Sequence, residues 1–315
     1  ACLFMAFNPF AVLLPLVIFA LRLFGQGMTS HIAVVAMARW FSAARGRALS
    51  VSALGFSAGQ AVLPIIFVML LGVMDWRLLW VVAAVIAVAG IPILQRLLRK
   101  ERTPQSMANE NPSLGMEGRY WKRFEALRHP LFWCMVPTVL GPSAFNTAFF
   151  FHQVHFAELK QITHIALVAQ FPLYTAVSVG AMLLSGWGLD KIGTPHLLPF
   201  IQVPMIAAFI IFARAQSTLM ITLGFIMLGI TAGAGATLPG AFWAEFYGTK
   251  FIGSIKALAT AVMVLGSAIG PGITGVMIDY GMGLETQFYW IAGYFALATI
   301  VLWIGVRKYA PSLKA

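Results

Sequence analysis

The chain has 315 residues, of which 60% are hydrophobic and only 10% are charged, and its mean hydropathy is +0.86. Soluble domains average about 25% charged residues, so this composition leaves too little polar surface to cover a water-soluble fold. The formal net charge of +11 does not indicate nucleic-acid binding, because Lys and Arg stand in short gaps between apolar runs and not on one solvated face. The composition therefore predicts an all-α membrane protein that crosses the bilayer several times.

The apolar runs set the expected number of spans, because a helix needs about 20 apolar residues to cross a bilayer. A shorter apolar stretch, Ala1–Phe7, comes first and is expected to be the tail of another helix in an N-terminally truncated chain. Nine full spans are expected after it: Phe10–Ala38, Arg47–Leu71, Trp76–Leu94, Leu131–Phe156, Ile162–Gly188, Leu197–Ala213, Leu219–Phe246, Phe251–Tyr280 and Thr286–Val306.

One long polar segment, rich in Arg, Lys, Glu and Pro, separates two hydrophobic blocks. We expect residues 1–95 to form the remainder of an N-terminal helical block. Residues 96–130 are expected to form a solvated cytoplasmic linker, and residues 131–315 a C-terminal block of six helices.

The basic residues are distributed asymmetrically between the two sides of the expected helices. Seventeen Lys and Arg fall on the side of the long linker and three on the other side. By the positive-inside rule, the linker and the C-terminus are cytoplasmic. The chain has no Asn-x-Ser/Thr glycosylation sequon, which favours a bacterial cytoplasmic membrane.

Two segments resemble each other at an offset of 207 residues, namely 45–65 and 252–272. Both follow a basic turn and are rich in small residues, which let helices approach closely in lipid. We expect Gly55, Gly59, Gly266 and Gly270 to lie at such helix contacts, and the repeat suggests two blocks related by an axis along the membrane normal.

The segment Gly55-Phe-Ser57-Ala-Gly59 also matches the G-x-S-x-G nucleophile elbow. That motif requires a strand-to-helix turn with His and acid partners, whereas here it falls inside an expected membrane helix. No phosphate-binding glycine loop is present either. We therefore expect neither an enzyme nor a cofactor.

The stretch GWGLDKIG interrupts an apolar run with the pattern Gly186-x-x-x-Asp190-Lys191-x-Gly193. This pattern resembles the signature loop of the major facilitator superfamily. The segment Arg22-Leu-Phe-Gly25-Gln-Gly27 is similar to the helix 4 motif of that family, and residues 39–59 resemble its monocarboxylate and oxalate/formate branch. The resemblance covers the whole chain and implies helices 3–12 of a twelve-helix fold.

The resemblance implies a secondary transporter that works by alternating access on a small solute. The branch suggests an organic anion, yet it commonly carries a basic residue in the middle of helix 8, and Ile162–Gly188 has none. A neutral metabolite or a drug-like efflux substrate is the alternative. A membrane sensor or scaffold that does not transport is a third interpretation, and its mark would be a filled, dry interface between the two blocks or a folded extra domain.

The signature pattern is expected to act as a conformational latch in a turn between two spans. Asp190 would end a helix where a neighbouring helix, beginning at Phe251, presents unpaired N–H groups and partial positive charge. The glycines Gly186 and Gly193 would keep the turn tight. Asp190 would bind the neighbouring helix in one conformation and release it in the other.

Polar residues inside the spans are candidates for contacting the solute or for joining helices. His31, Gln60 and Gln202 are expected mainly to make hydrogen bonds between helices. A buried Arg needs a partner and should face the bundle interior. The candidates for the cavity are Arg22, Asn146, His152, Gln153, Gln170 and Tyr174.

The histidines bear on two further types of chemistry, metal binding and proton coupling. His152, His155 and Glu158 spread around a helix, so no metal site is expected. All ten acidic residues lie in loops or at helix ends, so proton coupling would use either a carboxylate outside this chain or a histidine, His31 or His152. The expected partners are the lipid bilayer and a small-molecule substrate, with protons as a coupling ion.

Overall fold

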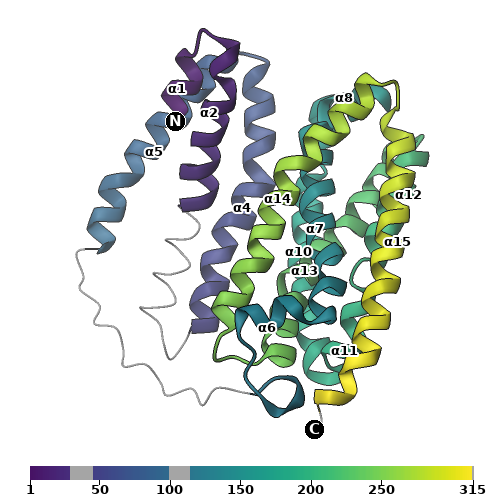
Figure 1. Ribbon diagram of the computed structural model, residues 1–315. Helices are drawn as coiled ribbons and strands as arrows, with labels where there is room; N and C mark the ends of the chain where they lie inside the picture. The colour runs from purple at the N-terminus through teal and green to yellow at the C-terminus, as the bar shows by residue number, and fades with distance from the viewer. Residues whose placement is uncertain (29–44, 99–113, 314–315) are drawn as a thin grey trace. The chain divides into compact units, whose positions relative to one another are not determined.

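The computed structural model describes residues 1–28, 45–98 and 114–313, and within these ranges every regular element is a helix (Figure 1). The chain divides into two units, Ala1–Glu110 and Asn111–Ala315. The second half of the expected span Phe10–Ala38, with His31, lies outside the described residues, as does the middle of the linker.

The first unit begins with a short helix that a proline ends. Asn8-Pro9 follows this helix, and the Asn8 Oδ1 atom accepts a hydrogen bond from the N–H of Phe10. Arg77 of α5 (Trp76–Leu98) donates to the carbonyl of Ala6 at 3.4 Å, so α1 (Cys2–Phe7) is joined to α5. The helices of the first unit are α1 (Cys2–Phe7), η1 (Ala11–Leu13), α2 (Leu14–Leu21), the π-helix η2 (Arg22–Met28), α4 (Arg45–Leu71) and α5 (Trp76–Leu98).

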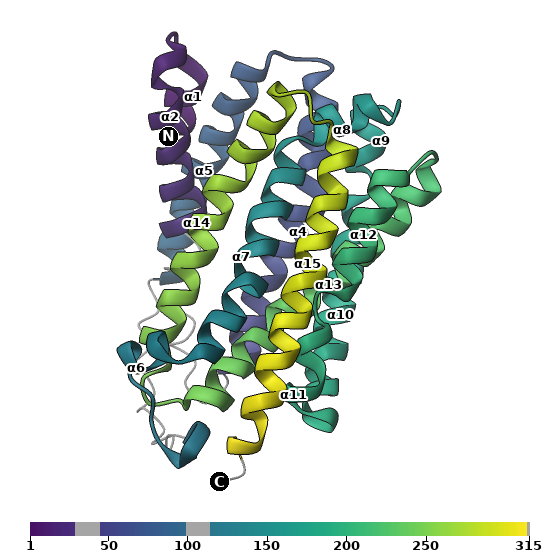
Figure 2. The same cartoon turned by 45° about the vertical axis from the view of Figure 1, so that its right-hand side comes forward.

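The second unit is a bundle of long helices that run alternately between two ends. Figures 1 and 2 show α6 (Arg123–Arg128), α11 (Thr194–Leu197) and the C-terminus at one end, called the linker end below. They show α8 (Gln153–Leu159) at the opposite end, called the far end. Its helices are η3 (Met116–Gly118), α6 (Arg123–Arg128), α7 (Pro130–Phe151), α8 (Gln153–Leu159), α9 (His164–Val168), α10 (Phe171–Ile192), α11 (Thr194–Leu197), η4 (Leu198–Phe200), α12 (Val203–Arg214), α13 (Thr218–Tyr247), α14 (Ile252–Asp279), α15 (Leu284–Tyr309) and η5 (Ala310–Leu313).

Among the described residues, seven helical segments are long and apolar enough to cross a membrane, so this is a multi-pass membrane protein. Two shorter apolar helices, Ala11–Gly25 and Gly55–Leu71, fall within two further expected spans. Three expected spans of the second unit are interrupted: Ile162–Gly188 between α9 and α10, Leu197–Ala213 between η4 and α12, and Leu131–Phe156. The segment Leu131–Phe156 breaks at His152, whose φ of −94° and ψ of 20° depart from helical values, and α8 begins after it.

Residues 114–130 differ from the solvated linker that their charge predicts, because they fold onto the second unit. The Trp121 side chain is only 3% exposed, and its Nε1 atom donates to the carbonyl of Met116 at 3.1 Å. The Trp121 N–H donates to the carbonyl of Tyr247 at the end of α13. Two large apolar side chains, Met116 and Trp121, thus anchor a segment that is otherwise polar.

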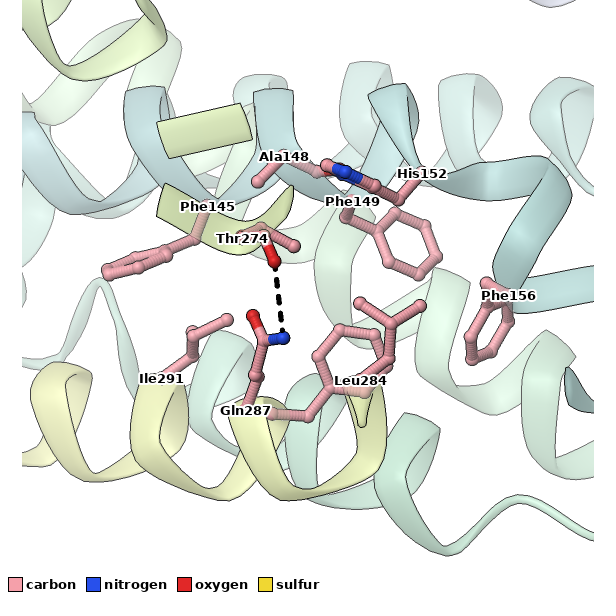
Figure 3. A pocket seen from close by; sticks show the side chains of 10 residues that line it. Phe145, Ala148, Phe149, His152, Phe156, Thr274, Leu284, Gln287 and Ile291 are labelled. Atoms are coloured by element: carbon pink, nitrogen blue, oxygen red, sulfur yellow. Dashed lines mark hydrogen bonds between the residues drawn. The ribbon is translucent and has the colours of Figure 1, made fainter. Parts of the chain in front are cut away.

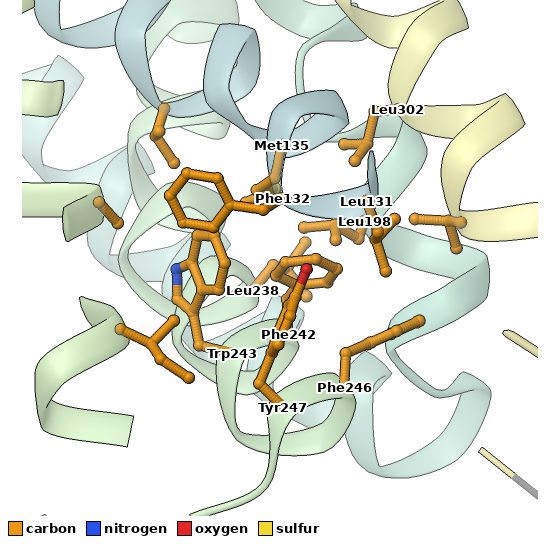
Figure 4. Packing of buried hydrophobic residues seen from close by; sticks show 14 of the residues in the cluster. Leu131, Phe132, Met135, Leu198, Leu238, Phe242, Trp243, Phe246, Tyr247 and Leu302 are labelled. Carbon is orange, nitrogen blue, oxygen red and sulfur yellow. The ribbon is translucent and has the colours of Figure 1, made fainter. Parts of the chain in front are cut away.

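Aromatic side chains of α13 form the core at the linker end. Phe242, Trp243, Phe246 and Tyr247 are all buried, and Figure 4 shows them beneath the first turns of α7. The centroids of the Phe242 and Trp243 rings lie 4.9 Å apart with an edge-to-face geometry, which aromatic pairs favour. This core fixes the position of α13 against α7.

Glycines set the closest helix approaches in the second unit. A Cβ on Gly266 would lie 2.8 Å from the carbonyl oxygen of Leu140, and one on Gly270 would overlap the backbone of Ala144, so α14 presses directly on α7. Gly229 and Gly233 of α13 approach the backbone of α10 in the same way, although the sequence analysis did not single them out.

The glycines of the first unit differ from these. A Cβ on Gly55 would meet no described atom within 4 Å, and one on Gly59 would touch only Leu63 of its own helix, at 3.6 Å. Gly55, Ser57 and Gly59 lie inside α4, so the G-x-S-x-G segment has no strand-to-helix turn.

Candidate solute-binding cavity

A cavity of about 380 Å³ lies inside the second unit, between α7, α12, α13 and α14. Its volume falls in the range of small-molecule pockets, and most of its surface is apolar. Its lining residues are Thr138, Val139, Pro142, Ser143, Asn146, Ile201, Gln202, Met205, Thr231, Ala232, Gly235, Ala236, Pro239 and Met263.

Buried polar atoms without a partner gather at this cavity. Nine such side-chain atoms occur in the part of the chain that the structure describes, and four belong to the cavity lining. Polar atoms inside proteins are normally hydrogen-bonded, so a group of unpaired ones indicates a place for a bound molecule or water. The four are Thr138 Oγ1, Asn146 Oδ1, Gln202 Oε1 and Thr231 Oγ1.

Gln202 owes its orientation to a proline in the neighbouring helix. Pro142 has no N–H, so the carbonyl of Thr138, four residues earlier in α7, loses its helical donor. The Gln202 Nε2 atom donates to this carbonyl at 2.9 Å. Because the amide nitrogen is used in this way, the Gln202 Oε1 atom is the one left free to accept a hydrogen bond.

The cavity is neutral, since none of the described side chains that line it carries a charge. A cation lies near its linker-end rim. The Lys256 Nζ atom stands 3.7 Å from the position of a Cβ on Gly240, the residue that follows the lining Pro239. The Ser143 hydroxyl donates to the carbonyl of Met263 and joins α7 to α14 at the cavity wall.

A second cavity, of about 10 Å³, lies toward the far end between α7, α14 and α15. Figure 3 shows His152, Thr274 and Gln287 around it together with Phe149 and Phe156. The Gln287 Nε2 atom donates to the carbonyls of Thr274 at 3.4 Å and Met282 at 2.8 Å. A space of this size holds about one water molecule and no organic solute.

A family model described as Major Facilitator Superfamily matches residues 1–213. The chain belongs to the Major Facilitator Superfamily. A search of curated proteins finds no match. Membership and the membrane-spanning helices together indicate a transporter of a small molecule.

The sequence predicts that the superfamily's signature pattern lies in a turn. In the structure most of it is helical. Residues Gly186 through Ile192 form the last two turns of α10, and only Gly193 leaves the helix, with a φ of +86° that favours glycine. Helix-internal glycine costs only about 1 kcal/mol, which packing in a membrane bundle can offset. The pattern therefore marks a helix end.

The latch contact is not formed in this conformation. Asp190 is exposed, and within the described residues it makes no hydrogen bond or ion pair. The Lys191 Nζ atom lies 5.6 Å from the centroid of the Trp187 ring, at cation–π distance. Whether Asp190 binds the first turn of α14 in another conformation stays a prediction.

Of the six residues expected at the cavity, Asn146 lines it. Gln170 accepts a hydrogen bond from the Thr222 hydroxyl at 2.9 Å and so joins two helices, while Tyr174 packs between aromatic rings of α7 and α13. His152 lines the small cavity, with its Nδ1 atom 3.0 Å from the carbonyl of Ala148.

The other two candidates lie elsewhere. Gln153 is at the start of α8, with a buried, unpaired Oε1 atom. Arg22 begins the π-helix of the first unit and is exposed there, and its orientation toward the bundle interior stays a prediction. No group of three His, Cys, Asp or Glu among the described residues is placed to hold a metal ion.

Three lining residues with unpaired atoms were missed as site residues: Thr138, Gln202 and Thr231. Gln202 was expected to make a helix–helix hydrogen bond, and it does so with its nitrogen. The one usable signal for Thr138 is the Pro142 four residues later, which predicts a free carbonyl in that turn.

Proposed function

We propose that this superfamily member is a secondary transporter that moves a small solute by alternating access, and that the cavity in the second unit binds the solute. The observation that supports this most is the unfilled volume of about 380 Å³, which carries four buried polar atoms without partners. Leaving such atoms unpaired costs free energy, so their retention is typical of a site that a ligand completes.

The orientation in the membrane follows from the charge distribution. We infer that the linker end of the second unit is cytoplasmic, because seventeen Lys and Arg fall on that side of the expected spans and three on the other. Nine spans, a bacterial cytoplasmic membrane and proton coupling belong to the same proposal. We also propose that the chain is divided into helical blocks 1–95 and 131–315 around the linker.

The neutral lining favours an uncharged solute over the organic anion that the sequence resemblance suggests. A carboxylate taken into an apolar cavity requires a cation or several donors within hydrogen-bond distance. Lys256 lies beside the cavity rim and does not line the cavity. The neutral-metabolite alternative is therefore the one that the site supports.

Uptake into liposomes tests the proposal. The full-length protein is reconstituted and assayed with labelled glucose, glucuronate, lactamide and lactate, which pair uncharged solutes with carboxylates of similar shape. Saturable uptake is expected, and Thr231→Val should reduce it. Thr175→Val is the matched control, because Thr175 is also buried and has an unpaired hydroxyl but lies outside the cavity. Absence of saturable flux for all four solutes would contradict the proposal.

A further inference from the structure

We propose that the polar floor of this cavity, formed by Thr138, Gln202 and Thr231, selects solutes that donate a hydrogen bond from an uncharged hydroxyl or amide group. The inference rests on the proposed function and goes further by naming the chemical class of the solute. It also assigns Gln202 as the residue that determines this preference.

The three side chains form a built site. Their exposed fractions are 4% for Thr138, 1% for Gln202 and 3% for Thr231, and each has an oxygen atom without a partner among the described residues. They come from α7, the start of α12 and the middle of α13, so the tertiary fold brings them to one cavity.

Gln202 supplies a fixed acceptor. Its amide nitrogen is held by the carbonyl that Pro142 leaves free in α7, so the amide cannot turn its oxygen away without losing that bond. A solute group that packs against the Gln202 Oε1 atom must donate a hydrogen to it. Otherwise a buried acceptor remains unpaired, which costs free energy and weakens binding.

The two threonine hydroxyls adapt to the solute, because each can donate or accept. A solute hydroxyl can donate to Gln202 and accept from Thr138 or Thr231. A carboxylate accepts only, so it would bring lone pairs against the Gln202 oxygen in a cavity with no charged lining residue. An uncharged polyol or amide therefore satisfies this floor, and a carboxylate does not.

The test measures binding separately from transport. Ala236, which lines the cavity and is exposed, is replaced by Cys in a background with Cys2→Ser and Cys134→Ala. Protection of this thiol from a methanethiosulfonate reagent is titrated with lactamide against lactate and with glucose against glucuronate. The proposal expects the uncharged member of each pair to protect the thiol and the carboxylate to protect it weakly.

Two isosteric variants identify the floor. Thr231→Val and Thr138→Val each remove an unpaired hydroxyl without changing shape, so both should fold. Each is expected to raise the half-protection concentration of the uncharged solutes by about 2- to 10-fold, the range of one neutral hydrogen bond. Thr175→Val should leave it unchanged.

Three outcomes overturn the inference: equal or stronger protection by carboxylates, no protection by either uncharged solute, or identical behaviour of Thr231→Val and Thr175→Val. Protection by carboxylates together with saturable carboxylate uptake would remove the acceptor floor and leave the proposed function standing. Preferential protection by the uncharged solutes without any saturable flux would support the acceptor floor and contradict the proposed function.

Discussion

Replacement of Gly270 by Ala should separate two helices of the second unit. A Cβ at this position would lie 2.7 Å from the carbonyl carbon and 2.8 Å from the Cα atom of Ala144. Ordinary contacts of this kind are 3.4–4 Å long, so the backbones of α7 and α14 must move apart by about 1 Å. No rotamer change relieves the overlap, because the opposing atoms belong to the backbone.

The expected magnitude comes from two opposing effects. Overpacking of this kind costs about 1–3 kcal/mol, while Gly→Ala within a helix gains about 1 kcal/mol. Gly272 on the same helix is the control, because a Cβ there would meet nothing within 4 Å and only the gain applies. Gly270→Ala should therefore be less stable than Gly272→Ala by about 1–3 kcal/mol.

Unfolding by SDS in mixed micelles, followed by tryptophan fluorescence, measures this difference in the free energy of unfolding. If Gly270→Ala and Gly272→Ala have the same unfolding midpoint, the close approach of α7 and α14 at Ala144 is wrong, and the reasoning with it.

Three further predictions follow from charged and titratable groups. The Lys160 side chain is 5% exposed and binds Glu285 and the carbonyl of Ala213. Because Glu285→Gln leaves a buried charge without its counter-ion, it should lower the free energy of unfolding by about 1–2 kcal/mol, and Lys160→Met should lower it by less. The reverse order of the two variants in SDS titrations would contradict this. Burial lowers the pKa of His129 from 6.5, and Arg119 and Lys308 lower it further against an opposing effect of Glu117, while its Nδ1 atom accepts from Leu131 at 3.3 Å. Stability should hold above about pH 6.5 and fall as pH drops from there through the lowered pKa, and His129→Asn should flatten this dependence in unfolding curves at several pH values; an unchanged profile would exclude His129. Asp190→Asn should slow transport more than it weakens solute binding, as proteoliposome uptake and thiol protection would measure; equal uptake rates in variant and parent would exclude the latch.

The positions of the long helices of the second unit could be predicted from hydropathy, because lipid forces each span to be long and apolar. The expected Leu219–Phe246 and Phe251–Tyr280 differ from α13 and α14 by one residue at each end. The break at His152 could not be predicted, since no Pro or Gly marks it.

It was harder to predict which face of each helix lines the cavity and which face meets lipid. In a soluble protein the polar face of a helix identifies the side that meets solvent, but α13 is apolar all round because both lipid and interior accept apolar groups. Thr231 therefore gives no sign of its direction. Gln202 and Thr138 are 64 residues apart, and only the tertiary fold brings them together.

The most direct test of the account is the two-sided accessibility of Ala236→Cys in sealed proteoliposomes, in the background without other cysteines. Alternating access predicts that a membrane-impermeant methanethiosulfonate reagent reaches this thiol from either side of the bilayer, and that a bound solute slows labelling from both. Labelling from one side alone under all solute and pH conditions would contradict the central claim that the cavity of the second unit lies on the transport path.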